Sequence, residues 1–190
     1  MKIVKTPIDG FLILEPNVYE DQRGFFLETF QEEVYKEQGI KDHFVQDNQS
    51  RSSKGVLRGM HFQFKNPQAQ IVTVMRGSIF DVGVDLRPHS KSFGEWFGVE
   101  LSDFGKRQIY MAPGIAHGFV VLSHFADLHY KVSRFYEPQD ERGLIWNDPK
   151  VNISWPKGTH IINKRDAEYP LLSELMENNQ LPNSPALNYK

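Results

Sequence analysis

Turn-forming residues cut most of this chain into short segments in which apolar and polar side chains alternate. Between residues 44 and 133 such segments recur about every 8–12 positions, separated by glycine, proline, asparagine, aspartate and serine. A period of two places successive side chains on opposite faces of a β-strand. Short strands with regular turn signals are typical of a sandwich or a barrel. The sequence therefore predicts an all-β fold with a few short helices.

The predicted strands cover most of the first 133 residues. Residues 31–38 depart from the alternation and predict a short helix that stops at Gly39, and residues 171–180 predict a second helix. The Pro- and Asn-rich residues 181–190 predict a flexible tail. With no repeat and no linker, residues 1–180 are expected to form a single domain. In chain order the predicted strands are residues 2–5, 11–14, 25–30, 44–51, 55–63, 68–74, 78–86, 93–101, 107–111, 118–122 and 127–133.

Composition narrows the functions that such a fold can have. Hydrophobic residues make up 39% of the 190 residues and the formal net charge is −2, so no global basic field points to nucleic acid or to an acidic membrane surface. The absence of cysteine excludes disulfides, thiolate metal sites and cysteine nucleophiles. The chain has no apolar run of ~18 residues and no signal-peptide core. We therefore expect a cytoplasmic protein without nucleic-acid or membrane partners.

One predicted strand, residues 55–63 (GVLRGMHFQ), carries a cation and an imidazole among apolar residues. Strict alternation places Leu57, Gly59 and His61 on the inward face, and Arg58 with Met60 on the other. A β-bulge at Gly59 would turn Arg58 inward as well. Taken alone, a histidine on an apolar face is more often a satisfied core residue than a catalyst. Whether His61 is a core residue or a catalyst therefore depends on the other residues that lie near it.

Three further segments carry side chains capable of chemistry. Residues 113–119 (PGIAHGF) form a turn with His117 at the mouth of a strand. Residues 127–131 place Tyr130 opposite a charged face, and residues 141–149 (ERGLIWNDP) are charged and then aromatic. Taken singly, these segments indicate a surface histidine, a core tyrosine and a surface loop anchored by tryptophan.

The spacing of His61 and His117 suggests a cupin, a jelly-roll β-barrel in which two motifs supply metal ligands. The second motif, Pro-Gly-x-x-His, is present at residues 113–117. The first motif is broken, because Gln63 stands where a metal cupin has its second histidine and the expected glutamate is missing. One histidine with glutamine and lysine is a poor site for zinc or iron. The prediction is cupin architecture without a metal.

Several segments, in order, resemble the dTDP-4-dehydrorhamnose 3,5-epimerase family: LRGMHFQ, RGSIFDVGVDLR, GEWFGVELS, KRQIYMAPGIAHGF, the YK of LHYK, and ERGLIWNDP. The resemblance runs from about residue 8 to about residue 172. It implies a metal-free cupin isomerase that needs no cofactor and acts on a nucleotide-diphosphate sugar, a 4-keto-6-deoxyhexose, in dTDP-rhamnose and O-antigen biosynthesis. It also implies a homodimer in which N-terminal strands join the neighbour's sheet.

The resemblance assigns the catalytic roles. His61 is the base that removes a proton beside the sugar ketone, and Asp166 is the carboxylate that orients it. Tyr130 returns a proton from the opposite face of the ring, which inverts the centre. A ketone acidifies the neighbouring C–H bonds, so a positioned acid and base suffice.

The chain departs from its family near the enolate oxygen. Gln70, in Ala69-Gln70-Ile71-Val72, stands where the family has lysine, and glutamine donates hydrogen bonds without a positive charge. His117 and Arg58 remain as donors to that oxygen. The other substrate contacts implied by the resemblance are Arg23 and Arg58 for the diphosphate, Glu28, Gln46, Asn48 and Glu141 for base and sugar, Arg165 where lysine is common, and Phe26, Phe135 and Tyr136 for stacking on the nucleobase.

Alternative functions stay open at this point. Gln70 motivates an epimerase that inverts only one centre, or one that takes a CDP-linked sugar. A metal-dependent cupin oxygenase is disfavoured by Gln63, and a catalytically idle sugar-binding module is disfavoured because His61, Tyr130 and Asp166 are all present.

Overall fold

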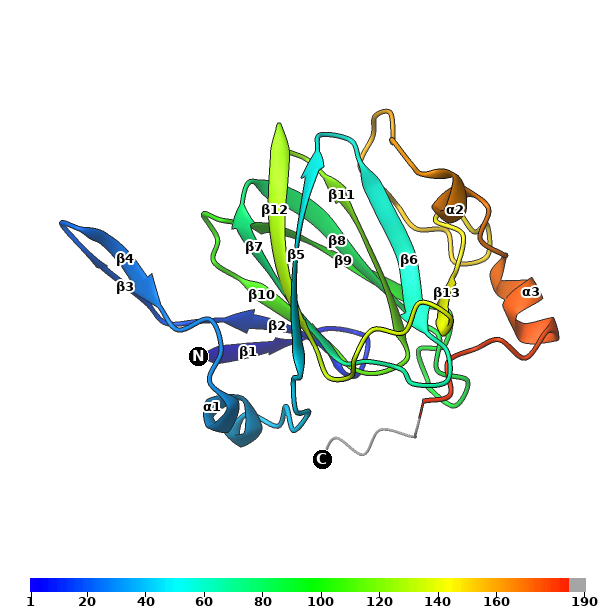
Figure 1. Ribbon diagram of the computed structural model, residues 1–190, viewed down its shortest axis with the longest axis horizontal. Helices are drawn as coiled ribbons and strands as arrows, with labels where there is room; N and C mark the ends of the chain where they lie inside the picture. Colours follow the sequence, from blue (N-terminus) through cyan, green and yellow to red (C-terminus); the bar gives the residue numbers. More distant parts are fainter. Residues whose placement is uncertain (185–190) are drawn as a thin grey trace.

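Two antiparallel β-sheets face each other in the computed structural model, which describes residues 1–184 (Figure 1). The six-stranded sheet has the order β1-β2-β10-β7-β12-β5, and the five-stranded sheet has the order β13-β6-β11-β8-β9. Two sheets packed in this way form a jelly-roll barrel. The all-β prediction is confirmed. The elements are β1 Lys2–Lys5, β2 Phe11–Glu15, β3 Val18–Asp21, β4 Gly24–Leu27, α1 Glu32–Glu37, β5 Gln46–Ser53, β6 Leu57–Gln63, β7 Gln70–Arg76, β8 Ser78–Asp85, β9 Trp96–Ser102, β10 Gln108–Met111, β11 Ile115–Val121, β12 Phe125–Val132, β13 Glu141–Gly143, α2 Lys164–Ala167 and α3 Leu172–Glu177.

Every predicted strand has an observed counterpart, with shifted ends. Three elements were not predicted: β3, β13 and α2. β13 has three residues and exists because it pairs with the edge of β6, while α2 is a single turn in which the Asn163 side chain accepts the Asp166 N–H. Neither is long enough to show a period in sequence.

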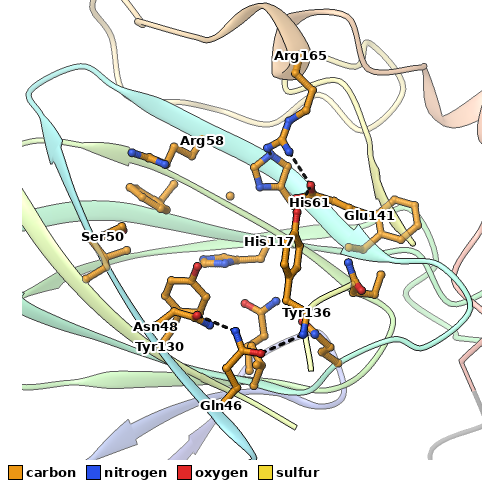
Figure 2. A pocket seen from close by; sticks show the side chains of 18 residues that line it. Gln46, Asn48, Ser50, Arg58, His61, His117, Tyr130, Tyr136, Glu141 and Arg165 are labelled. Carbon is orange, nitrogen blue, oxygen red and sulfur yellow. Dashed lines mark hydrogen bonds and ion pairs between the residues drawn. The ribbon is translucent and has the colours of Figure 1, made fainter. Parts of the chain in front are cut away.

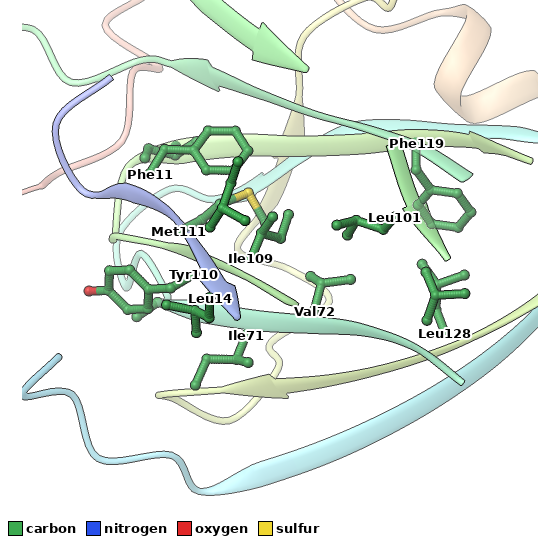
Figure 3. Close-up of a cluster of buried hydrophobic side chains, with 14 of the residues drawn as sticks. Phe11, Leu14, Ile71, Val72, Leu101, Ile109, Tyr110, Met111, Phe119 and Leu128 are labelled. Carbon is green, nitrogen blue, oxygen red and sulfur yellow. The ribbon is translucent and has the colours of Figure 1, made fainter. Parts of the chain in front are cut away.

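The main apolar core lies between the sheets and under α1 (Figure 3). Phe11, Val72 and Ile109 are fully buried there, and each such side chain contributes roughly 1.5–3 kcal/mol by leaving water. A second cluster lies between the five-stranded sheet and the C-terminal segment, and includes Met60 and Leu175. The C-terminal segment is therefore part of the domain and covers one sheet.

The β3–β4 hairpin extends away from the barrel at one side of the molecule (Figure 1). All of its strand residues except Leu27 are exposed. Tyr19, Phe25 and Phe26 are 62%, 56% and 68% exposed, and the Lys106 ammonium lies 3.6 Å from the centre of the Phe25 ring. The hairpin thus presents three aromatic rings that this chain does not bury.

Residues 181–184 of the expected tail lie against the barrel. The Asn183 N–H donates to the Phe64 carbonyl at 2.8 Å, and the Ser184 hydroxyl donates to the Pro113 carbonyl at 2.9 Å. Residues 185–190 of that expected tail are outside the described residues. Within residues 1–184, none of the helices has the length and apolarity needed to cross a membrane.

Candidate active site

A β-bulge in β6 puts two polar side chains on the same face. His61 lies opposite His117 on β11, but Arg58 lies opposite Phe119, so β6 has one more residue than β11 over this interval. Gly59 sits in the bulge with φ +128°, and a Cβ there would lie 2.5 Å from the Gly118 Cα. Only glycine fits so close to a neighbouring backbone. The bulge, which the sequence left open beside strict alternation, is observed.

The bulge changes which side chains of β6 share a face. Arg58 joins His61 at the cavity, whereas Met60 is fully buried in the second apolar cluster. The strict alternation that grouped Arg58 with Met60 was therefore wrong at this point. One extra residue in a strand moves every side chain beyond it to the opposite face of the sheet.

A cavity of about 270 Å³ lies between the sheets (Figure 2). Most of the residues expected to act on substrate line it, and Asp166 stands behind His61. Polar side chains come from both sheets, so a ligand in the cavity would be contacted from two sides. The expected residues that line it are Gln46, Asn48, Arg58, His61, Gln70, His117, Tyr130, Tyr136, Glu141 and Arg165.

His61 is held by a buried carboxylate. Its Nε2 lies 3.0 Å from Asp166 Oδ1, and Asp166 also accepts the Gly59 N–H at 3.1 Å. Asp166 is 0% exposed. Burial acts to raise the pKa of Asp166, but the hydrogen bonds from His61, Gly59 and Arg165 outweigh burial and lower its pKa to about 2. Asp166 is therefore ionised at neutral pH and fixes the orientation of the imidazole.

Arg165 connects this pair to the rim of the cavity. Its guanidinium donates to Asp166 Oδ1 at 3.1 Å and to Glu141 Oε2 at 2.6 Å, and its Nη2 lies 3.2 Å from His61 Nε2. The Tyr136 hydroxyl donates to the same Glu141 oxygen at 2.8 Å. Figure 2 shows Arg165, His61, Glu141 and Tyr136 close together at one end of the cavity.

A second histidine–aspartate pair was not predicted. His117 Nε2 lies 2.9 Å from Asp81 Oδ2, and Asp81 is 0% exposed. Burial raises the pKa of Asp81, and the His117 contact opposes that rise. The available signal in sequence was a carboxylate inside an otherwise apolar strand, SIFDVGVDL. Such a residue needs a partner in the interior.

Tyr130 lines the cavity from β12 of the six-stranded sheet, whereas His61 lines it from β6 of the five-stranded sheet. Burial is the largest influence on Tyr130 and raises its pKa; Arg58 opposes this and Glu141 adds to it. The phenol is therefore protonated at neutral pH. The predicted charged face of this strand is observed: Lys131 pairs with Asp47, and Asp127 pairs with Arg51.

The polar strand β5 borders the cavity, as its composition indicated. Gln46, Asn48 and Ser50 alternate with exposed residues and face inward. The Gln46 amide donates to Asn48 Oδ1 at 2.8 Å. These side chains present hydrogen-bonding groups rather than charges.

The residues around the broken cupin motif are engaged in other ways. Gln63 exchanges two hydrogen bonds with the backbone of Glu137, and each histidine directs Nε2 at its own carboxylate. Within residues 1–184 no group of three or more His, Asp or Glu side chains could hold a metal ion. Gln70 lines the cavity, and none of the lining residues identified in the described chain is a lysine.

Four expected contacts lie outside the cavity lining. Arg23 and Phe26 are on the projecting hairpin, Glu28 follows it, and none of them lines the cavity of its own chain. Arg23 is paired with Asp21, with its Nε 3.1 Å from Oδ2. Phe135 is 69% exposed and also outside the lining, whereas Tyr136 is part of it.

A jelly-roll barrel that aims an imidazole with a buried carboxylate and a phenol into one cavity from opposite sheets is equipped for proton transfer at a carbon centre. A family model described as dTDP-4-dehydrorhamnose 3,5-epimerase matches residues 5–174. The chain belongs to this family, whose reaction is an epimerisation, so the predictions of an isomerase and of a cupin-type barrel are confirmed.

Three relatives show the range of the family. A dTDP-4-dehydrorhamnose 3,5-epimerase of Methanothermobacter thermautotrophicus is 46% identical over 176 residues, covering 91% of this chain and 95% of the relative. The crystal structure of a Legionella pneumophila dTDP-6-deoxy-D-glucose-3,5-epimerase in complex with dTDP-4-keto-L-rhamnose matches with a TM-score of 0.93 and 46% identity, covering 97% of this chain and 99% of that one. A dTDP-4-dehydrorhamnose 3-epimerase of Streptomyces niveus is 39% identical, covering 96% and 89%.

Proposed function

We propose that this protein inverts C3 and C5 of dTDP-4-dehydro-6-deoxy-D-glucose to give dTDP-4-dehydro-L-rhamnose. The observation that carries the proposal is the placement of His61 and Tyr130 on opposite sheets across one cavity. Inversion requires a proton to leave one face of the ring and another to arrive at the opposite face. The 3,5-epimerases among its relatives support both the sugar and the number of centres.

In each half-reaction His61 takes the proton from the carbon beside the ketone. The electron pair of the C–H bond moves to the ketone oxygen, which leaves an enolate. The resulting imidazolium is stabilised by Asp166, ionised and 3.0 Å away. Tyr130 then donates its proton to the same carbon from the other side, and the enolate collapses to the ketone. Before the second half-reaction the imidazolium releases its proton to solvent and the Tyr130 phenolate takes one up.

The enolate oxygen needs donors in a water-poor site. Gln70, His117 and Arg58 line the cavity and are the groups available for it. The His117 Nε2 is occupied by Asp81, so the other ring nitrogen, Nδ1, is left for the ligand.

The nucleotide-diphosphate part of the substrate takes the remaining polar lining. Arg58 donates to Ser52 at 2.9 Å and keeps further N–H groups for phosphate oxygens, for which a guanidinium fork is well suited. Gln46, Asn48 and Glu141 offer both donors and acceptors for base and sugar. We place the reaction in the cytoplasm.

The assembly that we propose is a homodimer built through the N-terminal strands. β1 is the edge of the six-stranded sheet, and an edge strand offers free backbone groups for pairing. The adjoining hairpin carries Arg23 and Phe26 away from this chain's own cavity. In the dimer the hairpin covers the partner's cavity, and Arg23 and Glu28 complete the partner's site.

Mixing variants tests this arrangement. If Arg23 acts across the interface, Arg23→Ala and His61→Ala damage different sites, so a mixed dimer holds one intact site of two. At equal mixing about half of the dimers are mixed, and the preparation is expected to recover about a quarter of wild-type activity. No recovery after refolding the two together would refute the exchange, and light scattering would report the dimer directly.

A second candidate is an epimerase that inverts one centre only, favoured by Gln70 and by the Streptomyces niveus 3-epimerase. Proton NMR of dTDP-4-keto-6-deoxyglucose with the enzyme in D₂O separates the two. Deuterium at both C3 and C5 supports the 3,5-epimerase. Deuterium at one carbon supports the second candidate, and no exchange refutes both and directs the test to the CDP-linked sugar.

A further inference from the structure

The loop between β12 and β13 carries Tyr136, and glutamine side chains hold its backbone. The Gln68 amide donates to the carbonyls of Arg134 at 2.9 Å and of Phe135 at 3.2 Å. The next backbone group, the Tyr136 N–H, donates to Gln46 Oε1 at 3.0 Å. Polar backbone groups of consecutive residues thus find partners on side chains that are 66 to 90 positions away in sequence.

Gln63 holds the end of the same loop. Its amide nitrogen donates to the Glu137 carbonyl at 3.2 Å, and its Oε1 accepts the Glu137 N–H at 3.1 Å. Glutamine has a donor and an acceptor at the same reach, which a carboxylate or an aliphatic side chain lacks. Gln63 is 5% exposed and Gln68 is 9% exposed, so the loss of these bonds is not made good by water.

The loop positions Tyr136, which connects the cavity wall to the His61–Asp166 pair through Glu141 and Arg165. The Tyr136 ring lines the cavity, and its hydroxyl bonds Glu141, which in turn binds Arg165. His61 and Asp166 do not depend on the loop, because they stand on β6 and α2 and are tied to each other and to Gly59. Displacing the loop would therefore move Tyr136 away from Glu141 but leave the base in place.

We propose that Gln46, Gln63 and Gln68 form a glutamine clamp that positions Tyr136 for binding of the nucleotide-sugar. This inference rests on the proposed function. The clamp acts on substrate affinity and not on proton transfer, and Gln63 and Gln68 are positioning residues. Gln63 thus has a use at the position where a metal cupin has a ligand.

The experiment compares Gln63→Met and Gln68→Met with Gln108→Met. Gln108 is a matched control: it is 1% exposed and its amide also donates two hydrogen bonds, to the Thr29 carbonyl and to the buried Thr73 hydroxyl, but it does not touch the loop. Three quantities are measured: amide hydrogen exchange of residues 134–137 in the free protein, Kd for dTDP by calorimetry, and kcat with KM for the sugar nucleotide.

The clamp variants are expected to speed exchange at residues 136 and 137, and to raise Kd for dTDP and KM by about tenfold while kcat changes less than about threefold. The control is expected to leave the loop exchange, Kd and KM at wild-type values. Faster loop exchange without a change in Kd and KM, or an equal rise in KM in the control, would overturn the inference.

Two further outcomes are informative. If Gln63→Met does not fold, Gln63→Glu replaces it: it keeps the acceptor for the Glu137 N–H, loses the donor, and is expected to give an intermediate exchange rate and Kd. A wild-type protein that binds dTDP but epimerises nothing would refute the proposed function while the Kd comparison still decides the clamp. Failure of the wild type to bind dTDP would overturn the clamp.

Discussion

His61 and His117 lie directly opposite each other on β6 and β11, and each directs Nε2 at its own buried aspartate. The two pairs differ in their surroundings: Asp166 accepts two further hydrogen bonds, from Gly59 and Arg165, that stabilise its charge, whereas Asp81 is bonded by His117 alone among the described contacts. The first pair suits a base that must accept a proton repeatedly. The second suits a donor that faces the developing oxyanion.

Replacing the base should abolish exchange at carbon. We expect His61→Asn to lower kcat by about 10²–10⁴-fold, because no other cavity side chain takes over proton removal. Proton NMR in D₂O should show loss of deuterium incorporation at both C3 and C5. Unchanged incorporation would show that a different residue is the base.

Tyr130→Phe should separate proton removal from inversion. His61 can still form the enolate, but the opposite face has lost its acid, so deuterium should return from the original face. The NMR spectrum is then expected to show exchanged substrate of unchanged configuration, with inverted product reduced by at least about 10²-fold. Full inversion in this variant would remove Tyr130 from the mechanism.

Asp166 should stabilise the fold except in strong acid. Its pKa in the folded protein, about 2, is below the ordinary value of 3.8, so its contribution is complete above about pH 4 and is lost as pH falls through about 2. The contribution is at most about 2 kcal/mol. Urea unfolding of wild type and Asp166→Asn at several pH values should show a stability difference at pH 7 that shrinks towards pH 2. A difference independent of pH would contradict the assignment.

Gly59→Ala should destabilise the protein more than an equally strained glycine elsewhere. Gly59 and Gly158 have φ values of +128° and +141°, but a Cβ at Gly158 meets no atom within 4 Å, while a Cβ at Gly59 lies 2.5 Å from the Gly118 Cα. Chemical denaturation should give a loss about 2 kcal/mol larger for Gly59→Ala than for Gly158→Ala, the cost of forcing two backbones apart. Equal losses would mean that the strands separate freely.

Gln70→Lys tests whether the enolate needs a cation at this place in the cavity. A lysine there would add positive charge beside the oxyanion, and we expect kcat on the thymidine-linked substrate to rise several-fold. Gln70→Met is the control that removes the hydrogen bond donor and should lower kcat. If Gln70→Lys gives no gain, the existing donors already supply the stabilisation.

The fold could be predicted because strand alternation and turn residues are local signals. The paired faces of β12 followed from the period of two, whereas the bulge at Gly59 was only one of two possibilities. β13 and α2 could not be predicted, since each is only a few residues long and shows no period in sequence.

The candidate site was harder to predict, for a physical reason. The cavity residues named from resemblance lie together, but their partners do not show in any local pattern: Asp81 bonds a residue 36 positions away, and Gln63 bonds one 74 positions away. Arg23 and Glu28 do not line the cavity of their own chain, and no local pattern in the sequence indicates this. Contacts set by tertiary folding leave only weak traces in sequence, such as a carboxylate in an apolar strand.

The strands of the two sheets and the charged residues that hold His61 come from different parts of the chain, because Arg165 and Asp166 lie on α2. Every strand of both sheets has been synthesised by Gly143, but Arg165 and Asp166 come more than 20 residues later. A chain cut between these points would hold all its strands and the imidazole of His61, with one sheet left uncovered and no carboxylate behind the base. The last part of the chain therefore supplies both the carboxylate that holds His61 and the cover of one sheet.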